Sequence, residues 1–292
     1  RWSTRSIWAW ATTKPTATAA YVADVIPEDR RGEAQGSLGI FTATGMSIGP
    51  AIGSFLAAHY GLDQMFYISS IFALASIVIL SRMKETLPKA MKSRFSFSLF
   101  RIGWKDVFEP KVVPVFWVML FVSFSAGAMI TLIPDTSKLV GWTNKGLYFT
   151  IYTISSILIR FFFSKASDQY GRIPVLIFGC FMLSLSMFLL VFSANSYLLI
   201  VSAIIYGMAW GVNTPTLAAW TNDLGDKNHM GRAMATMYIA LEAGIGIGAY
   251  VSGEIYQGVA SQIPIPFLLA ALLSLLAFIL LWTKKRNWTY WI

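Results

Sequence analysis

The stretch GSLGIFTATGMSIGPAIGS, residues 36–54, contains no charged side chain and repeats glycine at Gly45, Gly49 and Gly53. Glycines four residues apart lie on nearly one face of a helix, although each costs about 1 kcal/mol relative to alanine in an exposed helix. A smooth face compensates for this cost in a membrane, because it lets another backbone approach closely. Pro50 removes one helical hydrogen bond, so the stretch predicts a kinked, closely packed membrane helix.

The composition of the whole chain also indicates an integral membrane protein. Of its 292 residues, 56% are hydrophobic and only 13% are charged, and the mean hydropathy is +0.60. Apolar runs of about 20 residues match the thickness of a bilayer core. We expect an all-α membrane protein with spans near residues 4–23, 36–58, 64–83, 112–133, 146–163, 173–193, 196–219, 233–256 and 264–283.

The positive charge follows the expected membrane topology. The formal net charge is +9, but most lysines and arginines fall in alternate connections and in the tail 284–286, whereas the other connections hold only Lys138 and Lys145. This asymmetry places the basic connections and the C-terminus in the cytoplasm of a plasma-membrane or inner-membrane protein. It also argues against a nucleic-acid partner, and it places residue 1 on the outer side.

The sequence lacks the side-chain groupings of an enzyme or a metalloprotein. The single cysteine, Cys180, lies within an apolar run, and no cluster of His and Cys suggests a metal site. We find no catalytic triad and no phosphate-binding loop. We therefore expect no cofactor and no enzymatic activity.

An internal repeat suggests two related lobes. A shift of 199 residues matches Gly45 and Gly49 with Gly244 and Gly248, among nine identities in 36 positions. Parallel duplication of a membrane lobe predicts such a repeat, although similarity between glycine-rich helices is the alternative. Six spans follow residue 112 and three precede it, so we expect an N-terminally truncated chain holding helices four to twelve of twelve.

The glycine stretch resembles the antiporter motif of the fifth helix in drug:proton antiporters of the major facilitator superfamily. The matching positions are Gly36, Gly45, Gly49, Pro50 and Gly53, and the stretch departs from the motif at Ser54. The resemblance implies that this glycine face packs on the helix near 146–163 and that Pro50 controls closure of the outer half. Ordinary helix packing without a gating role is the alternative.

A second motif, SKASDQYGR at residues 164–172, is similar to the loop between the eighth and ninth helices of this superfamily. The resemblance implies that Asp168, Gly171 and Arg172 form a cytoplasmic latch that breaks when the protein opens inward. The alternative is a solvated loop pair. Arg160 lies two turns earlier among aromatic residues, and we expect it to face the lobe interface or Asp168, because exposure to lipid is costly.

The resemblance covers nearly the whole chain and implies two helical lobes around a central cavity. The expected organisation is a remnant of the N-terminal lobe at 1–83, a cytoplasmic linker at 84–111 and a C-terminal lobe at 112–292. The implied activity is export of small amphiphilic molecules in exchange for protons, by alternating access and as a monomer. A metabolite uptake symporter of the same fold and a non-transporting membrane receptor or scaffold are the alternatives.

Four further residues are candidates for the transport chemistry. Glu242 is the one carboxylate well inside a predicted span. Because removal from water favours the protonated form of a carboxylate, it is our candidate for proton coupling, with a structural ion pair to Arg160 as the alternative. We expect Trp210, Asn213 and Thr214 to contact the substrate; for Trp210, core packing is the alternative.

Overall fold

The computed structural model describes a helical chain that divides into two compact units. The first contains α3 (Leu62–Ser81) and the second contains all later helices. Each unit is considered by itself. The structure describes residues 45, 49, 52–53, 55–57, 59–81, 108–163, 166–192, 195–226 and 230–288.

Helix α3 shows how a lone apolar helix satisfies its polar side chains. Four serines donate hydrogen bonds to backbone carbonyls three or four residues earlier, at 2.8–2.9 Å. These bonds need no water and no second helix. The helix therefore suits a bilayer, where an unsatisfied hydroxyl would be costly.

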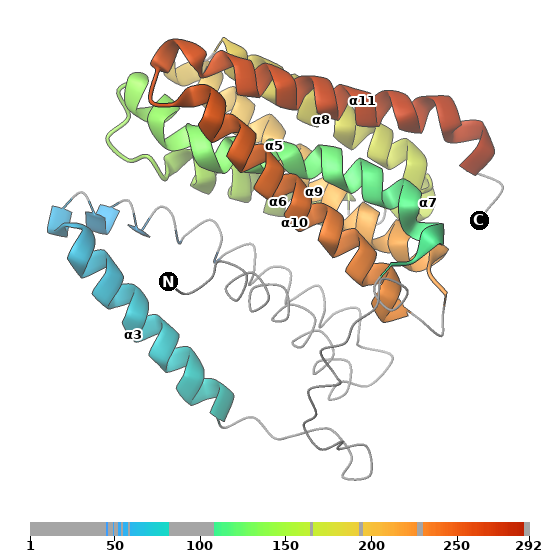
Figure 1. Cartoon of the computed structure of the whole chain (residues 1–292), viewed down its shortest axis with the longest axis horizontal. Helices are drawn as coiled ribbons and strands as arrows, with labels where there is room; N and C mark the ends of the chain where they lie inside the picture. Colours follow the sequence, from blue (N-terminus) through green and yellow to red (C-terminus); the bar gives the residue numbers. More distant parts are fainter. Residues whose placement is uncertain are drawn as a thin grey trace. The chain divides into compact units, whose positions relative to one another are not determined.

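The described part of residues 108–288 is a bundle of six long helices and three short ones (Figure 1). The long helices are α5 (Val113–Leu139), α6 (Leu147–Phe163), α8 (Arg172–Val191), α9 (Ser196–Leu224), α10 (Met230–Tyr256) and α11 (Pro264–Trp288). The short helices are η4 (Pro110–Val112), α7 (Ala166–Gln169) and η6 (Ala260–Gln262). Among the described residues, six helices are long and apolar enough to cross a membrane, and α6 contains a shorter apolar helix at Leu147–Arg160.

The helix ends carry the expected local signals. Pro110 and Pro114 lie in the first turns of η4 and α5, where a missing amide is tolerated. The Asn195 side chain accepts a 2.9 Å hydrogen bond from the amide of Leu198 and so caps α9. After α10, Gln257 and Gly258 turn the chain with φ of 40° and 81°.

The bundle is organised by a series of helix contacts that runs from α10 to α6. Helix α10 packs on α5, α5 on α11, α11 on α8, α8 on α9, and α9 on α6. Short connections make consecutive long helices antiparallel. The start of α5, α8 and α10 therefore lies at the same end of the bundle as the end of α6, α9 and α11 (Figure 1).

Two of the helix contacts are close because glycine is present. A Cβ atom on Gly248 would lie 2.3 Å from the carbonyl oxygen of Phe124, and one on Gly127 would lie 2.2 Å from that of Ile245, so α5 and α10 meet backbone to backbone. A Cβ on Gly207 would lie 2.0 Å from the carbonyl oxygen of Tyr152 in the α6–α9 contact. Substitution by any larger residue requires these helices to separate.

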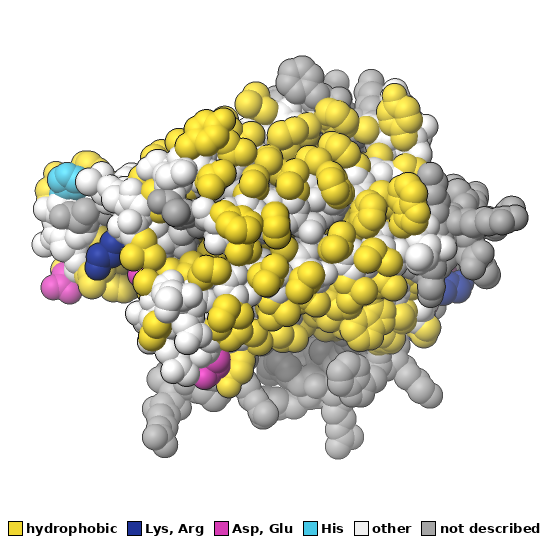
Figure 2. Space-filling model, turned by 90° about the horizontal axis from the view of Figure 1, so that it is seen from above, with side chains coloured by type: hydrophobic (Ala, Val, Ile, Leu, Met, Phe, Trp, Pro, Cys, Tyr) yellow, Lys and Arg dark blue, Asp and Glu magenta, His cyan; other side chains and the backbone are white. Residues whose placement is uncertain are grey.

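The outside of the bundle is apolar. Figure 2 shows hydrophobic side chains over most of the visible face of the described residues, with charged side chains near its margins. The exposed hydrophobic residues of α8 and α11 include Phe181, Phe188, Leu272 and Ile279. Such a surface is stable in contact with lipid, in agreement with the expected membrane class.

Candidate functional site

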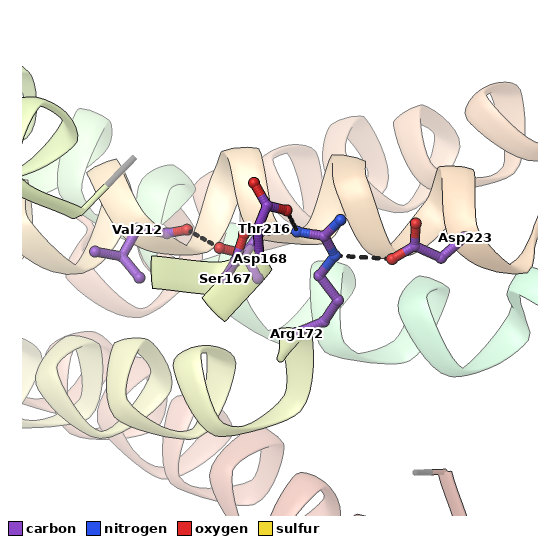
Figure 3. A network of polar contacts seen from close by, with 6 residues as sticks. All are labelled: Ser167, Asp168, Arg172, Val212, Thr216 and Asp223. Atoms are coloured by element: carbon purple, nitrogen blue, oxygen red, sulfur yellow. Dashed lines mark hydrogen bonds and ion pairs between the residues drawn. The ribbon is translucent and has the colours of Figure 1, made fainter. Parts of the chain in front are cut away.

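Arg172 is the centre of a polar network at one end of the bundle (Figure 3). Its Nε donates to Asp223 at 2.8 Å, and its Nη1 donates to Ser167 Oγ at 2.8 Å and to Asp168. Gly171 precedes it with φ of 87°, a conformation that favours glycine. The network therefore joins α7, the first residue of α8 and the end of α9.

The network is only partly shielded from water. The Arg172 side chain is 17% exposed, whereas Asp168 is 65% and Asp223 is 36% exposed. Exposed ion pairs contribute little to stability, so such contacts can break and re-form at low cost. The structure thus brings together the predicted Asp168, Gly171 and Arg172 and adds Asp223, which the motif does not contain.

A second ion pair lies at the same end of the bundle. Arg232, near the start of α10, donates from Nε and Nη2 to Glu109 Oε2 at 2.8 and 2.5 Å. The amide of Glu109 also donates to Thr236 Oγ1 at 2.8 Å. The Glu109 side chain is only 5% exposed, so this pair fixes the segment before α5 to α10 more firmly than Arg172 fixes its neighbours.

Arg160 lies on α6 and does not join the Arg172 network. Its Nε is buried and has no hydrogen-bond partner among the described residues, and no ion pair links it to Asp168 or Glu242 in that part of the chain. Tyr152 lies two turns earlier on the same helix. The described chain thus offers Arg160 no acidic partner.

Glu242 lies in the middle of α10, two residues before Gly244. Its side chain is half-buried, and within residues 108–288 as described no ion pair includes it. Gly244 packs on α5, where a Cβ would lie 2.5 Å from the carbonyl oxygen of Leu120. The carboxylate of Glu242 is therefore carried by a helix, α10, that packs closely on α5.

The three predicted substrate contacts lie on two sides of α9. The ring of Trp210 stacks on Tyr206, with centroids 6.0 Å apart, and Thr214 donates to the Trp210 carbonyl at 2.9 Å. Asn213 is fully buried and faces α8, where a Cβ on Gly179 would lie 2.0 Å from its Oδ1. Trp210 and Thr214 are half-buried and remain the more accessible pair.

The antiporter-like stretch is described only in part. Gly45, Gly49 and Gly53 are helical. Gly36 and Pro50 lie outside the described residues. The packing of this helix on α6 and the gating role of Pro50 stay predictions.

Within the described ranges, no group of three or more His, Cys, Asp and Glu side chains is placed to hold a metal ion. The charged side chains described above lie within or at the ends of apolar helices, and those of Arg172 and Arg232 are paired with acids.

Comparison with known proteins assigns the family. A family model for the Major Facilitator Superfamily matches residues 8–145 and 136–287. A multi-drug resistance efflux pump PmrA homolog of Lactococcus lactis is 24% identical over 247 residues, covering 82% of this chain and 60% of the relative. Multidrug resistance protein 2 of Bacillus subtilis is 24% identical over 287 residues, covering 93% of this chain and 69% of the relative.

An uncharacterized MFS-type transporter of Methanocaldococcus jannaschii is 24% identical over 245 residues, covering 80% of this chain and 62% of the relative. The chain thus spans about three fifths of the length of the first relatives it matches, at 62% and 60%. The family match extends over both units of the structure. The chain belongs to the major facilitator superfamily.

Proposed function

We propose that the protein exports small amphiphilic molecules in exchange for protons, by alternating access across the plasma membrane. The superfamily consists of membrane transporters, and two of the similar proteins are named as multidrug efflux or resistance proteins. The export of drug-like molecules by this chain is an inference from those names and from the antiporter-like glycine stretch. The transporter acts as a monomer in the lipid bilayer. It needs no cofactor, and the proton gradient drives the transport.

The observation that carries this proposal is the network around Arg172. It joins three helix ends through contacts that are largely open to water, at the end of the bundle that the charge distribution assigns to the cytoplasm. Charge-assisted hydrogen bonds hold these ends in one state, and water can replace them when they separate. This is the property required of a latch that closes the inner side and opens to admit substrate.

Glu242 is the proposed proton-coupling residue. It lies on α10, a helix that packs tightly on α5 and so moves with it as a unit. Its side chain is half-buried and has no ion-pair partner in the described structure, so no salt bridge has to break before it takes part in proton transfer. Proton binding there and substrate binding in the cavity would compete, which couples the two flows.

Everted membrane vesicles containing the full chain test this function. Respiration acidifies the vesicle interior, so an antiporter accumulates ethidium inside, and nigericin, which collapses the pH gradient, should prevent the accumulation. Glu242→Gln should abolish gradient-driven accumulation, whereas Glu254→Gln, an exposed acid on the same helix, should not. Movement of ethidium with the proton gradient would instead indicate a symporter, and no movement of any amphiphile tested would favour a receptor or scaffold.

A further inference from the structure

Arg160 is a cation within an apolar span for which the described chain provides no acid. Its Nε is buried without a hydrogen bond among the described residues, whose arginine ion pairs involve Arg172 and Arg232 instead. A guanidinium in a membrane span is costly unless something satisfies it. The residues around Arg160 therefore indicate which class of ligand its guanidinium binds.

The register of α6 against α9 places Arg160 on an identifiable side of this helix pair. A Cβ on Gly207 would meet Tyr152, and one on Gly211 would meet Ile159 at 2.5 Å, so the contacts advance in the same direction along both helices. The two helices therefore run parallel. Arg160 follows the contact residue Ile159 by one position, a rotation of about 100°.

Trp210 lies on the same side of the pair. It precedes the contact residue Gly211 by one position, a rotation of about 100° in the opposite sense. In two parallel helices that face each other, opposite rotations lead to the same flank. The ring contact between Tyr152 and Tyr206, with centroids 5.5 Å apart, supports this shared flank, because Tyr206 also precedes a contact glycine by one position.

This flank thus combines one guanidinium with a stack of aromatic rings. Tyr206 and Trp210 are parallel to within 10°, and Tyr152 meets Tyr206 edge to face. Trp210 is only half-buried, so part of its side chain remains accessible. Arg160 is left with donors that match the two oxygens of a carboxylate.

We propose that Arg160 and Trp210 form a subsite of the transport cavity that selects flat aromatic molecules carrying an anionic group. The inference rests on the proposed export function, and it specifies the chemical class of the substrate. The ring of the ligand stacks on Trp210, while its carboxylate accepts hydrogen bonds from Arg160. A neutral analogue keeps the stacking contact and loses the ionic one.

Binding of a matched pair of probes tests the subsite. Tritiated 2-naphthoate and its neutral analogue 2-naphthamide are bound to the full chain in nanodiscs, with empty nanodiscs as background. Because charge-assisted hydrogen bonds are among the stronger ones, Arg160→Gln should weaken naphthoate binding by about tenfold or more and naphthamide binding by less than about twofold. Arg160→Lys should give an intermediate loss for naphthoate, since it retains the charge but not the planar fork.

Two controls separate the subsite from general effects. Lys138→Gln removes one positive charge from the exposed far end of α5 and should change neither affinity. Trp210→Leu should weaken both probes alike. Equal loss of both probes in Arg160→Gln, or unchanged naphthoate binding, would show that Arg160 has a structural role and overturn the proposal.

A measurement on the unsubstituted protein covers the case in which Arg160→Gln does not fold. Naphthoate should raise the melting temperature more than naphthamide at equal concentration, since the ligand with the lower Kd stabilises the folded state more. Equal shifts would contradict the subsite. If naphthoate binding depends on Arg160 but vesicles show no proton-driven export, the export function fails and the subsite stands. If vesicles show proton-driven export but naphthoate binding does not depend on Arg160, the export function stands and the subsite fails.

Discussion

The Glu109–Arg232 and Asp168–Arg172 ion pairs lie at the same end of the bundle and differ in burial, and burial should decide their contributions to stability. Glu109→Gln leaves the partly buried guanidinium of Arg232 without its carboxylate, which should cost roughly 3 kcal/mol. Asp168→Asn removes an acid that is 65% exposed, which should cost about 0–1 kcal/mol. Thermal unfolding in nanodiscs should therefore show a clear loss for the first variant and almost none for the second.

Both substitutions replace one carboxylate by its amide, so each is the control for the other. A loss in Asp168→Asn as large as that in Glu109→Gln would mean that the Arg172 network is a structural clamp. It would then be too stable to act as a latch. The proposed inward opening requires that Asp168→Asn lowers the stability only slightly.

Contacts between side chains were predictable only where a local motif carries them. The resemblance of residues 164–172 to a superfamily loop implied that Asp168 and Arg172 lie together, and the structure pairs them. Asp223 was missed as a partner, since it lies 51 residues from Arg172. Its one sequence signal is that it repeats Asp24 at the 199-residue shift.

The Glu109–Arg232 pair had no sequence signal at all. Its two residues are 123 positions apart, and Glu109 lies at the end of a stretch predicted as a linker. Periodicity shows which face of a helix is apolar, but it does not show which residue faces which across a bundle. Contacts of this kind become visible only when the helices are packed.

At the scale of elements, the glycine contacts of α10 predict different effects of alanine substitution at two nearby positions, Gly248 and Gly246. Gly248→Ala places a Cβ 2.3 Å from the Phe124 carbonyl oxygen, so α10 must move away from α5. Gly246→Ala meets nothing within 4 Å and replaces glycine by a better helix former. We expect a lower melting temperature and weaker transport for the first variant, and unchanged or higher stability for the second.

If both glycine variants behave alike, close backbone contact is not what holds α5 to α10. Alanine is the matched choice, since it adds one carbon in each case. The comparison also bears on the repeat, because Gly248 is the counterpart of Gly49. A large effect at Gly248 would make close packing at Gly49 a stronger expectation.

The existence of the later helices was predicted well, and their ends less well. The run predicted at 112–133 is the helix Val113–Leu139, and the run predicted at 196–219 is Ser196–Leu224. In both cases hydropathy falls before the helix ends, because a helix can continue into the interface beyond the apolar core. Pro134 does not end α5, since proline removes only one helical hydrogen bond.

At the scale of the whole molecule, the family match confirms the predicted all-helical membrane class and the resemblance to the superfamily. Composition and span length decide this class, since only hydrogen-bonded helices of this length bury so much apolar sequence in lipid. The division into lobes at 83 and 111 stays a prediction. It depends on a linker of which residues 84–107 lie outside the described residues.

The orientation of the molecule in the membrane is the last prediction. The end of the bundle that contains Tyr170 should face the cytoplasm, and the end that contains Leu139 should face outward, because basic residues accumulate on the first side. Both side chains are exposed, at 71% and 61%. Cys180 is fully buried, so the unsubstituted protein should not react with a membrane-impermeant maleimide.

Intact cells should therefore label Leu139→Cys and not Tyr170→Cys, while permeabilised cells should label both. The two variants share the buried Cys180, so each reports the side of one introduced thiol alone. Labelling of Tyr170→Cys in intact cells would reverse the orientation and place the Arg172 network on the outer side. An outer network could not close the cytoplasmic entrance, so the same result would remove the structural basis of the proposed latch while leaving the aromatic anion subsite open to test.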